Sequence, residues 1–116
     1  MNKVKIGCDI VLVKRCEGNE ALARGILSPY EAEEYGKRVN KAEFLAGHFA
    51  AKEAFLKAEG TGLAKARLSE IEIRYRKGGQ PYLLFGGKEY ECSISHDGGY
   101  AFAVVLYEEP RKNIAA

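Results

Sequence analysis

The spacing of apolar and polar positions changes twice along the chain. Apolar and polar residues alternate, with many β-branched side chains, in residues 3–13 and again in the last third of the chain. The segments between are rich in Ala, Leu, Lys and Glu, which favour helix. The pattern predicts strands at 3–13, 71–76, 81–85, 92–96 and 100–107, and helices at 19–26, 28–38 and 41–59. We expect an α+β fold in which one long helix packs on a mainly antiparallel sheet.

Short motifs locate the ends of several elements. Residues 28–31 (Ser-Pro-Tyr-Glu) form a capping box, with Ser28 as the N-cap and Pro29 at the first helical position. Gly60 follows the longest helix and suits its C-terminal cap. Residues 77–80 (Lys-Gly-Gly-Gln) predict a hairpin turn before a strand that Pro81 opens.

The helix predicted at 41–59 carries ionisable side chains inside its apolar face. His48 and Lys52 lie within the apolar arc, Glu53 lies at its edge and Lys57 lies just beyond it. A buried ammonium such as that of Lys52 needs a partner, and phosphate oxygens would serve. Extension of the Lys52 side chain to water is the simpler alternative. The apolar positions of this arc are Phe44, Leu45, Phe49, Phe55 and Leu56.

Asp9 is a second charge in an unusual place. It stands among apolar neighbours in a segment that we interpret as a central strand, so it should be paired or bound to a metal. Asp9 and Glu53 on facing elements suit Mg²⁺, which takes one or two protein carboxylates and leaves other positions to water and phosphate. Two structural ion pairs explain the same residues and are favoured by spacing alone. Lys57, one turn beyond Glu53, is also common on a solvated helix face.

Composition and charge narrow the class of protein. The 116 residues support a single domain, residues 1–116. Lys and Arg total 18 against 16 acidic residues, and this net charge of +2 argues against a nucleic-acid partner. No apolar run approaches the roughly 20 residues of a membrane span. Three cysteines without a C-x-x-C pair, and no signal-peptide pattern, indicate reduced thiols in the cytoplasm. So short a chain favours an active site at a subunit boundary.

Three segments together resemble the holo-acyl-carrier-protein synthases, the small type of 4′-phosphopantetheinyl transferase. The first is I-G-C-D-I at residues 6–10, followed by Arg15 and Glu17. The second is F-L-A-G-H-F-A-A-K-E-A-F-L-K-A at residues 44–58, followed by G-T-G at residues 60–62. The third is S-I-S-H at residues 93–96. The resemblance covers nearly the whole chain, and the second segment is its most specific part.

The resemblance implies transfer of 4′-phosphopantetheine from coenzyme A to a serine of apo acyl carrier protein. The products would be the holo carrier, which serves fatty acid biosynthesis, and adenosine 3′,5′-bisphosphate. Asp9 and Glu53 match the family's Mg²⁺ ligands, and Lys57 matches a lysine that reaches the phosphates. Either Glu53 or a metal-bound water would take the serine proton. The expected contacts to coenzyme A are His48, Lys52, Gly60, Thr61, Gly62, Pro81, Ser95 and His96.

The resemblance also implies a homotrimer with sites between subunits, and Pro81 would then come from the neighbouring subunit. Arg15 matches a basic position that faces the acidic carrier protein. Many members carry Arg in place of His48 at a position that helps to hold a coenzyme phosphate. We therefore expect coenzyme A binding that weakens above neutral pH, as an imidazole loses its charge.

Two alternatives remain at this point. The same transfer could serve a carrier domain of a polyketide or peptide synthetase. A non-catalytic module could instead bind an acidic protein through Lys14, Arg15 and Arg24, but that leaves Asp9 and Lys52 without a role.

Overall fold

Within the part of the chain that the computed structural model describes, residues 3–60 and 67–109, five strands form one antiparallel sheet. The strand order is β1-β5-β4-β3-β2, so β1 lies at one edge. The expectation of a central position for this strand was therefore wrong. The strands are β1 (Val4–Leu12), β2 (Glu72–Tyr75), β3 (Pro81–Phe85), β4 (Lys88–Asp97) and β5 (Tyr100–Glu108).

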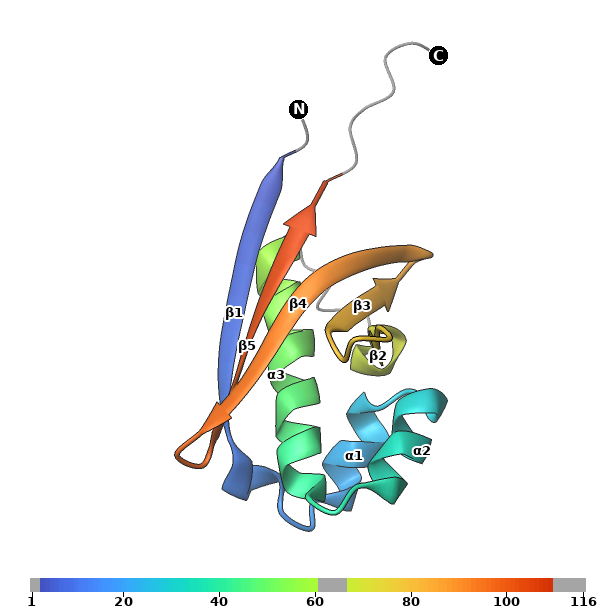
Figure 1. Ribbon diagram of the computed structural model, residues 1–116, viewed down its shortest axis with the longest axis vertical. Helices are drawn as coiled ribbons and strands as arrows, with labels where there is room; N and C mark the ends of the chain where they lie inside the picture. Colours follow the sequence, from blue (N-terminus) through green and yellow to red (C-terminus); the bar gives the residue numbers. More distant parts are fainter. Residues whose placement is uncertain (1–2, 61–66, 110–116) are drawn as a thin grey trace.

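β4 is longer than the predicted segment 92–96 because it serves two parts of the sheet. Its first residues, 88–91, pair with β3, and its remaining residues, 92–97, pair with β5. The sheet bends along this strand, so β2 and β3 turn away from the plane of β1 and β5 (Figure 1). The bend leaves room for a helix against one face of the sheet.

That helix is α3 (Lys41–Glu59), whose ends agree with the predicted 41–59. Asn40 caps its first turn, and Gly60 ends it in the left-handed conformation, with φ 75°. Not all of the apolar positions predicted to face the core are fully buried, because Phe49 and Leu56 keep part of their side chains exposed. Many of the buried residues of α3 are small. They let the helix approach the sheet closely on one side and the rest of the chain on the other. The small buried residues of α3 are Ala46, Gly47, Ala50, Ala51, Ala54 and Ala58.

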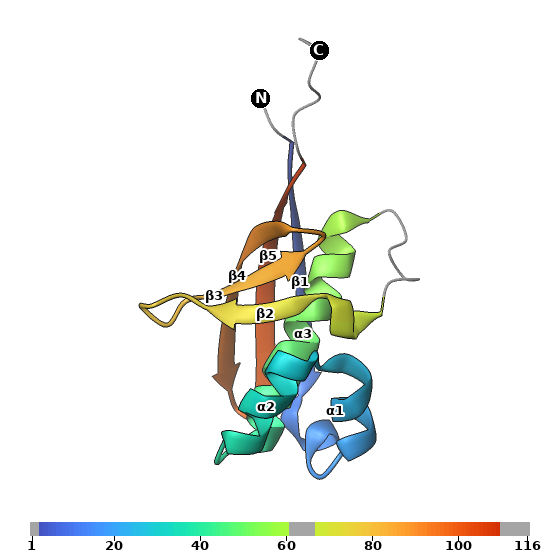
Figure 2. The same ribbon diagram turned by 90° about the vertical axis from the view of Figure 1, so that its right-hand side faces the viewer.

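Two shorter helices lie at the end of α3 where that helix begins (Figure 2). They are α1 (Glu20–Ile26) and α2 (Pro29–Lys37), joined to β1 by a short 3₁₀ helix, η1 (Val13–Cys16). The predicted capping box is confirmed: the Glu31 backbone N–H donates to the Ser28 hydroxyl, and the Ser28 backbone N–H donates to the Glu31 carboxylate. A second 3₁₀ helix, η3 (Leu68–Glu70), precedes β2.

The face of the sheet that points away from α3, here called the outer sheet face, is exposed and apolar. Ile6 lies opposite Leu106 and Ile10 opposite Phe102 across the β1–β5 pair. Ile6 is 69% and Ile10 58% exposed. The more apolar set of alternating positions in β1 thus points to solvent, while Gly7, Asp9 and Val11 point to the helix. A contiguous exposed apolar surface of this kind marks an interaction site.

Two further predictions concern the chain as a whole. Cys8, Cys16 and Cys92 are all free thiols, as expected. Among the described residues, no helix combines the length and the apolar character needed to cross a membrane.

Candidate active site

β1 and α3 approach each other more closely than a side chain would permit. A Cβ atom placed on Gly7 would lie 2.0 Å from the carbonyl oxygen of Ala54 and 2.6 Å from the amide nitrogen of Ala58. Only glycine fits at this contact, because such distances are far inside van der Waals separation. The contact brings Asp9, two residues further along the same strand face, to the last turns of the helix.

Asp9 forms an ion pair with Lys57 across this contact. The Lys57 ammonium donates to Asp9 Oδ1 at 2.9 Å, and the Lys57 side chain is 58% exposed. The hydrogen bond to Asp9 and the charge of Asp9 raise the pKa of Lys57, and the charge of Glu53 adds to that increase. Glu53 lies one turn before Lys57, is half-buried, and makes no hydrogen bond within the described part of the chain. The structure therefore gathers Asp9, Glu53 and Lys57 at one site on the surface.

Arg15 lies near the other end of the same helix face. It is an exposed residue of η1, and its guanidinium carbon is 6.0 Å from the centroid of the Phe49 ring. Phe49, Glu53 and Lys57 follow one another at four-residue spacing, so they form a stripe along α3. Arg15 and the Asp9 site thus flank one continuous strip of surface.

Lys52 is not available for phosphate, so the prediction of such a contact was wrong. Its side chain has no exposure, and its ammonium donates to Glu31 Oε1 at 2.6 Å and to the carbonyl oxygens of Ile26 and Leu68. Extension to water is excluded by the same burial. Burial lowers the pKa of Lys52 and the charge of Glu31 opposes that effect. Lys52 instead ties α3 to α2 and to the residues before β2.

His48 is also buried, with 1% exposure, and its behaviour differs from the predicted one. Its Nδ1 lies 2.9 Å from the carbonyl oxygen of Phe44, which can only accept, so Nδ1 carries a proton. Burial lowers the pKa of His48 to about 3, and the positive charges of Lys52 and Arg38 act in the same direction. Glu31 lies 3.9 Å from Nε2, beyond hydrogen-bond distance, and Lys52 already neutralises it. His48 is therefore neutral near pH 7, and the expected loss of its charge above neutral pH does not apply.

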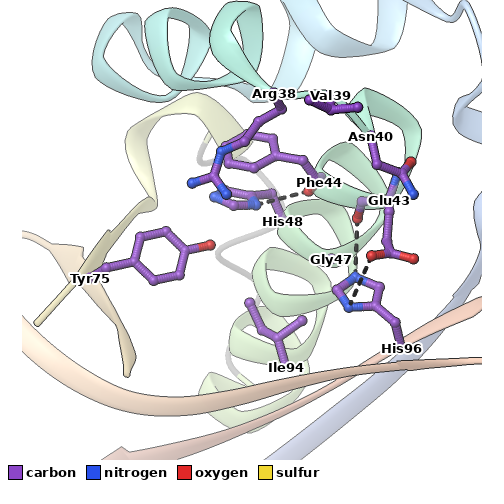
Figure 3. A pocket seen from close by; sticks show the side chains of 10 residues that line it. All are labelled: Arg38, Val39, Asn40, Glu43, Phe44, Gly47, His48, Tyr75, Ile94 and His96. Atoms are coloured by element: carbon purple, nitrogen blue, oxygen red, sulfur yellow. Dashed lines mark hydrogen bonds and ion pairs between the residues drawn. The ribbon is translucent and has the colours of Figure 1, made fainter. Parts of the chain in front are cut away.

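A pocket of about 310 Å³ lies beside His48, between the start of α3, the α2–α3 connection, β2 and β4. The Phe44 and His48 rings stack with centroids 3.9 Å apart, and the Arg38 guanidinium lies beside them (Figure 3). His48 Nε2 is buried without a hydrogen-bond partner in the described part of the chain. The pocket is lined by Arg38, Val39, Asn40, Glu43, Phe44, Gly47, His48, Tyr75, Ile94 and His96.

His96 reaches this pocket because α3 lacks a side chain at Gly47, where a Cβ atom would lie 3.1 Å from His96 Nε2. His96 Nε2 is 3.1 Å from the backbone oxygen of Glu43, and Nδ1 is 4.0 Å from the carboxylate of Glu43. His96 thus joins β4 to the first turn of α3. The structure brings His48 and His96 to the same pocket, and their contact with a ligand stays a prediction.

The remaining predicted contacts are dispersed in one chain. Ser95 pairs with Phe102 and is exposed on the outer sheet face, opposite His96. Pro81 begins β3 opposite Tyr75, at the base of the hairpin loop that projects from the body of the chain (Figure 2). Gly60 caps α3 near Lys57, and Thr61 and Gly62 lie outside the described residues.

Sequence reasoning did not identify Arg38 and Tyr75 as pocket residues. Both come from segments without a motif, and the fold alone brings them beside Phe44. Burial raises the pKa of Tyr75 to about 12, so its hydroxyl remains protonated. The Arg38 guanidinium carbon is 4.7 Å from the Phe44 ring centroid and 6.0 Å from that of Tyr75.

Comparison with known proteins points to one family. The model of the 4′-phosphopantetheinyl transferase superfamily matches residues 5–105. A holo-[acyl-carrier-protein] synthase of Halothermothrix orenii is 38% identical over 120 residues, covering 90% of this chain and 96% of that protein. One from Shouchella clausii is 40% identical over 117 residues, covering 90% and 97%. The crystal structure of a Bacillus anthracis holo-(acyl-carrier-protein) synthase in complex with CoA (3′,5′-ADP) has a TM-score of 0.82 at 35% identity, covering 95% of this chain and all of that one.

Proposed function

The chain belongs to the 4′-phosphopantetheinyl transferase superfamily, and on that premise we propose that it transfers 4′-phosphopantetheine from coenzyme A to a serine of apo acyl carrier protein. The products are the holo carrier, for fatty acid biosynthesis, and adenosine 3′,5′-bisphosphate. The observation that carries the proposal is the gathering of Asp9, Glu53 and Lys57 across the β1–α3 contact. Two carboxylates and a lysine on facing elements provide the groups that a reaction at a diphosphate requires.

Asp9 and Glu53 fit the Mg²⁺ that the family resemblance implies. Each is half-buried, and they come from two rigid elements held together at Gly7. Among the described residues, no cluster of three or more His, Cys, Asp or Glu side chains could hold a metal. Two carboxylates are nevertheless enough for Mg²⁺, which takes one or two protein carboxylates and fills its other positions with water and substrate phosphates. A bound Mg²⁺ would neutralise charge on the diphosphate of coenzyme A.

Lys57 acts on the phosphates in this proposal. Its ammonium is a cation at neutral pH, and the hydrogen bond and charge of Asp9, with a smaller effect of Glu53, raise its pKa further. Its long, exposed side chain can exchange the Asp9 oxygen for a phosphate oxygen and stabilise the charge that develops on the leaving group. Glu53, which has no hydrogen bond within the described residues, is available as a metal ligand or as the acceptor of the serine proton.

Coenzyme A would extend from this site to the pocket beside His48. A pocket of about 310 Å³ with stacked rings suits an adenosine group, and His48 and His96 both border it. Gly60, which caps α3 near Lys57, remains a proposed contact, and so do Thr61 and Gly62, which lie outside the described residues. Ser95 and Pro81 are proposed to reach the coenzyme across a subunit boundary.

A homotrimer with sites between subunits accounts for the outer sheet face. Seven exposed apolar side chains of β1 and β5 form this face, which a solitary chain would leave in water. Burial of the face against neighbouring chains would place Ser95 at a boundary between subunits. The acidic carrier would approach the strip that begins at Arg15, where its charge meets exposed cations. Both substrates would be met in the cytoplasm.

The test is the intact mass of apo acyl carrier protein after incubation with the protein, coenzyme A and Mg²⁺. We expect a gain of one phosphopantetheine group, and loss of transfer in Asp9→Asn and Glu53→Gln at unchanged melting temperature. Glu33→Gln, an exposed carboxylate on α2, is the matched control and should keep full activity. Retained turnover in both site variants at low Mg²⁺ would contradict the proposal. A panel of apo carriers from polyketide and peptide synthetases tests whether such domains are substrates instead.

A further inference from the structure

Lys57 binds a carboxylate that the proposed metal also needs. Its ammonium donates to Asp9 Oδ1 at 2.9 Å, and Asp9 has no other side-chain hydrogen bond within residues 3–60 and 67–109. The charge of Glu53 acts on the same ammonium. Lys57 therefore lies beside both carboxylates that we assign to Mg²⁺, at a position that a bound cation would need.

The two partners of this ion pair differ in their freedom to move. Asp9 belongs to β1, which is held against α3 at Gly7, where the Ala54 carbonyl leaves no room for a Cβ atom. The Asp9 side chain is 18% exposed, and that of Lys57 is 58% exposed on a flexible four-carbon stem. A cation that approaches Asp9 would therefore displace the lysine and leave the carboxylate in place.

The charge of the site depends on where the Lys57 ammonium lies. Two carboxylates and one ammonium leave a single net negative charge while the ion pair is closed. The closed ammonium occupies Asp9 Oδ1 and repels a divalent cation. When the ammonium moves away, both negative charges face the metal position. A nearby diphosphate offers the ammonium other oxygens for charge-assisted hydrogen bonds. Metal and diphosphate thus favour the same open arrangement of Lys57.

We propose that Lys57 competes with the divalent cation for Asp9, and that it leaves Asp9 when the diphosphate of coenzyme A offers it other oxygens. This inference rests on the proposed function. Lys57 would then make the binding of metal and coenzyme cooperative, because the ligand that binds first opens the ion pair for the other. An ion pair with one exposed partner changes an equilibrium constant by about 2- to 5-fold.

The first test measures cation binding without coenzyme or carrier, from the loss of the electron paramagnetic resonance signal of free Mn²⁺. Lys57→Met removes the ammonium and should bind Mn²⁺ about 2- to 5-fold more tightly than the wild-type protein. Lys57→Arg keeps a cation and should return the affinity toward the wild-type value. Lys5→Met is the matched control and should keep the wild-type affinity, because Lys5 pairs with Glu109 at 2.6 Å instead of with Asp9.

The second test measures coenzyme A binding by titration calorimetry in EDTA and at saturating Mg²⁺. The factor by which Mg²⁺ tightens this binding should be about 2- to 5-fold smaller in Lys57→Met, because coupling between two ligands is reciprocal. Equal Mn²⁺ affinities in the wild-type protein and Lys57→Met, or equal tightening factors, would overturn the inference. Failure of the proposed function is a separate result, namely no transfer by the wild-type protein. The Mn²⁺ titrations use no carrier, so they still decide the competition in that case.

Discussion

Replacement of Lys52 by methionine separates the structural role of this lysine from a catalytic one. Methionine has nearly the same length and volume, so packing is largely kept while the charge is lost. The variant leaves the Glu31 carboxylate and the carbonyl oxygens of Ile26 and Leu68 without the ammonium that now binds them. We expect the folded state to be strongly destabilised and the active site to be intact in the molecules that fold.

The size of the effect follows from what Glu31 retains. Breaking a buried ion pair typically costs about 3–5 kcal/mol. Two backbone N–H groups, those of Ser28 and Ile73, still donate to Glu31 at 2.8 and 2.9 Å, which moderates the cost. We therefore expect a loss of about 3–4 kcal/mol in the free energy of unfolding, which lowers the melting temperature by roughly 10–20 °C for a chain of this size.

The assay is thermal unfolding at one fixed protein concentration, combined with the KM for coenzyme A at a temperature where both proteins are folded. Lys57→Met is the matched control, because its side chain is largely exposed. It should lose transfer activity and keep its melting temperature. An unchanged melting temperature in Lys52→Met, together with a raised KM for coenzyme A, would refute the structural role of Lys52. It would support the sequence-based prediction that Lys52 contacts a phosphate.

Three further predictions concern other parts of the molecule. Gly7→Ala should force β1 away from Ala54 by roughly 1 Å, since the shortest carbon–oxygen contacts are about 3.3 Å. The free energy of unfolding in urea should fall by about 1–3 kcal/mol, and kcat should fall as well because Asp9 moves with β1. A wild-type kcat would count against the close contact. His48 has a folded-state pKa of about 3, below its unfolded value of 6.5, so protonation favours unfolding. Stability should fall as the pH drops from about 6.5 toward 3, less so in His48→Gln, and the pH dependence of the KM for coenzyme A between about 6.5 and 8.5 should be the same in both proteins. Ile6→Glu and Phe102→Glu, on the outer sheet face, should shift the protein to monomers in analytical ultracentrifugation and abolish transfer; a fully active monomer would contradict a site between subunits.

The helices were the most predictable part of the fold. α3 has the predicted ends because Asn40, Gly60 and an Ala-rich interior are local signals that no tertiary contact opposes. The capping box at Ser28 was confirmed for the same reason. Which side of β1 faces the core could not be predicted from hydrophobicity, because the small residues Gly7, Ala101 and Ala103 occupy the buried side and the large apolar residues face out.

The candidate site was predictable where chemistry and spacing coincide. Asp9 and Glu53 were singled out as carboxylates in unusual places, and Lys57 was identified only through the family resemblance. The fold brings the three together, while their roles stay predictions. Lys52 met the same criterion for a different reason, since its partner Glu31 lies 21 residues away in a capping box. No local pattern connects these two residues, so only the packing of α2 against α3 reveals the pair.

β4 contributes residues both to the outer sheet face and to the pocket beside His48. Successive residues of a strand point to opposite faces, so Ser95 lies on the outer sheet face while His96 borders the pocket beside His48. A neighbour that displaces this strand by even a fraction of a residue must therefore move the pocket wall as well. If chains associate through the outer sheet face and coenzyme A binds beside His96, as proposed, the two events would be coupled through adjacent residues of one strand.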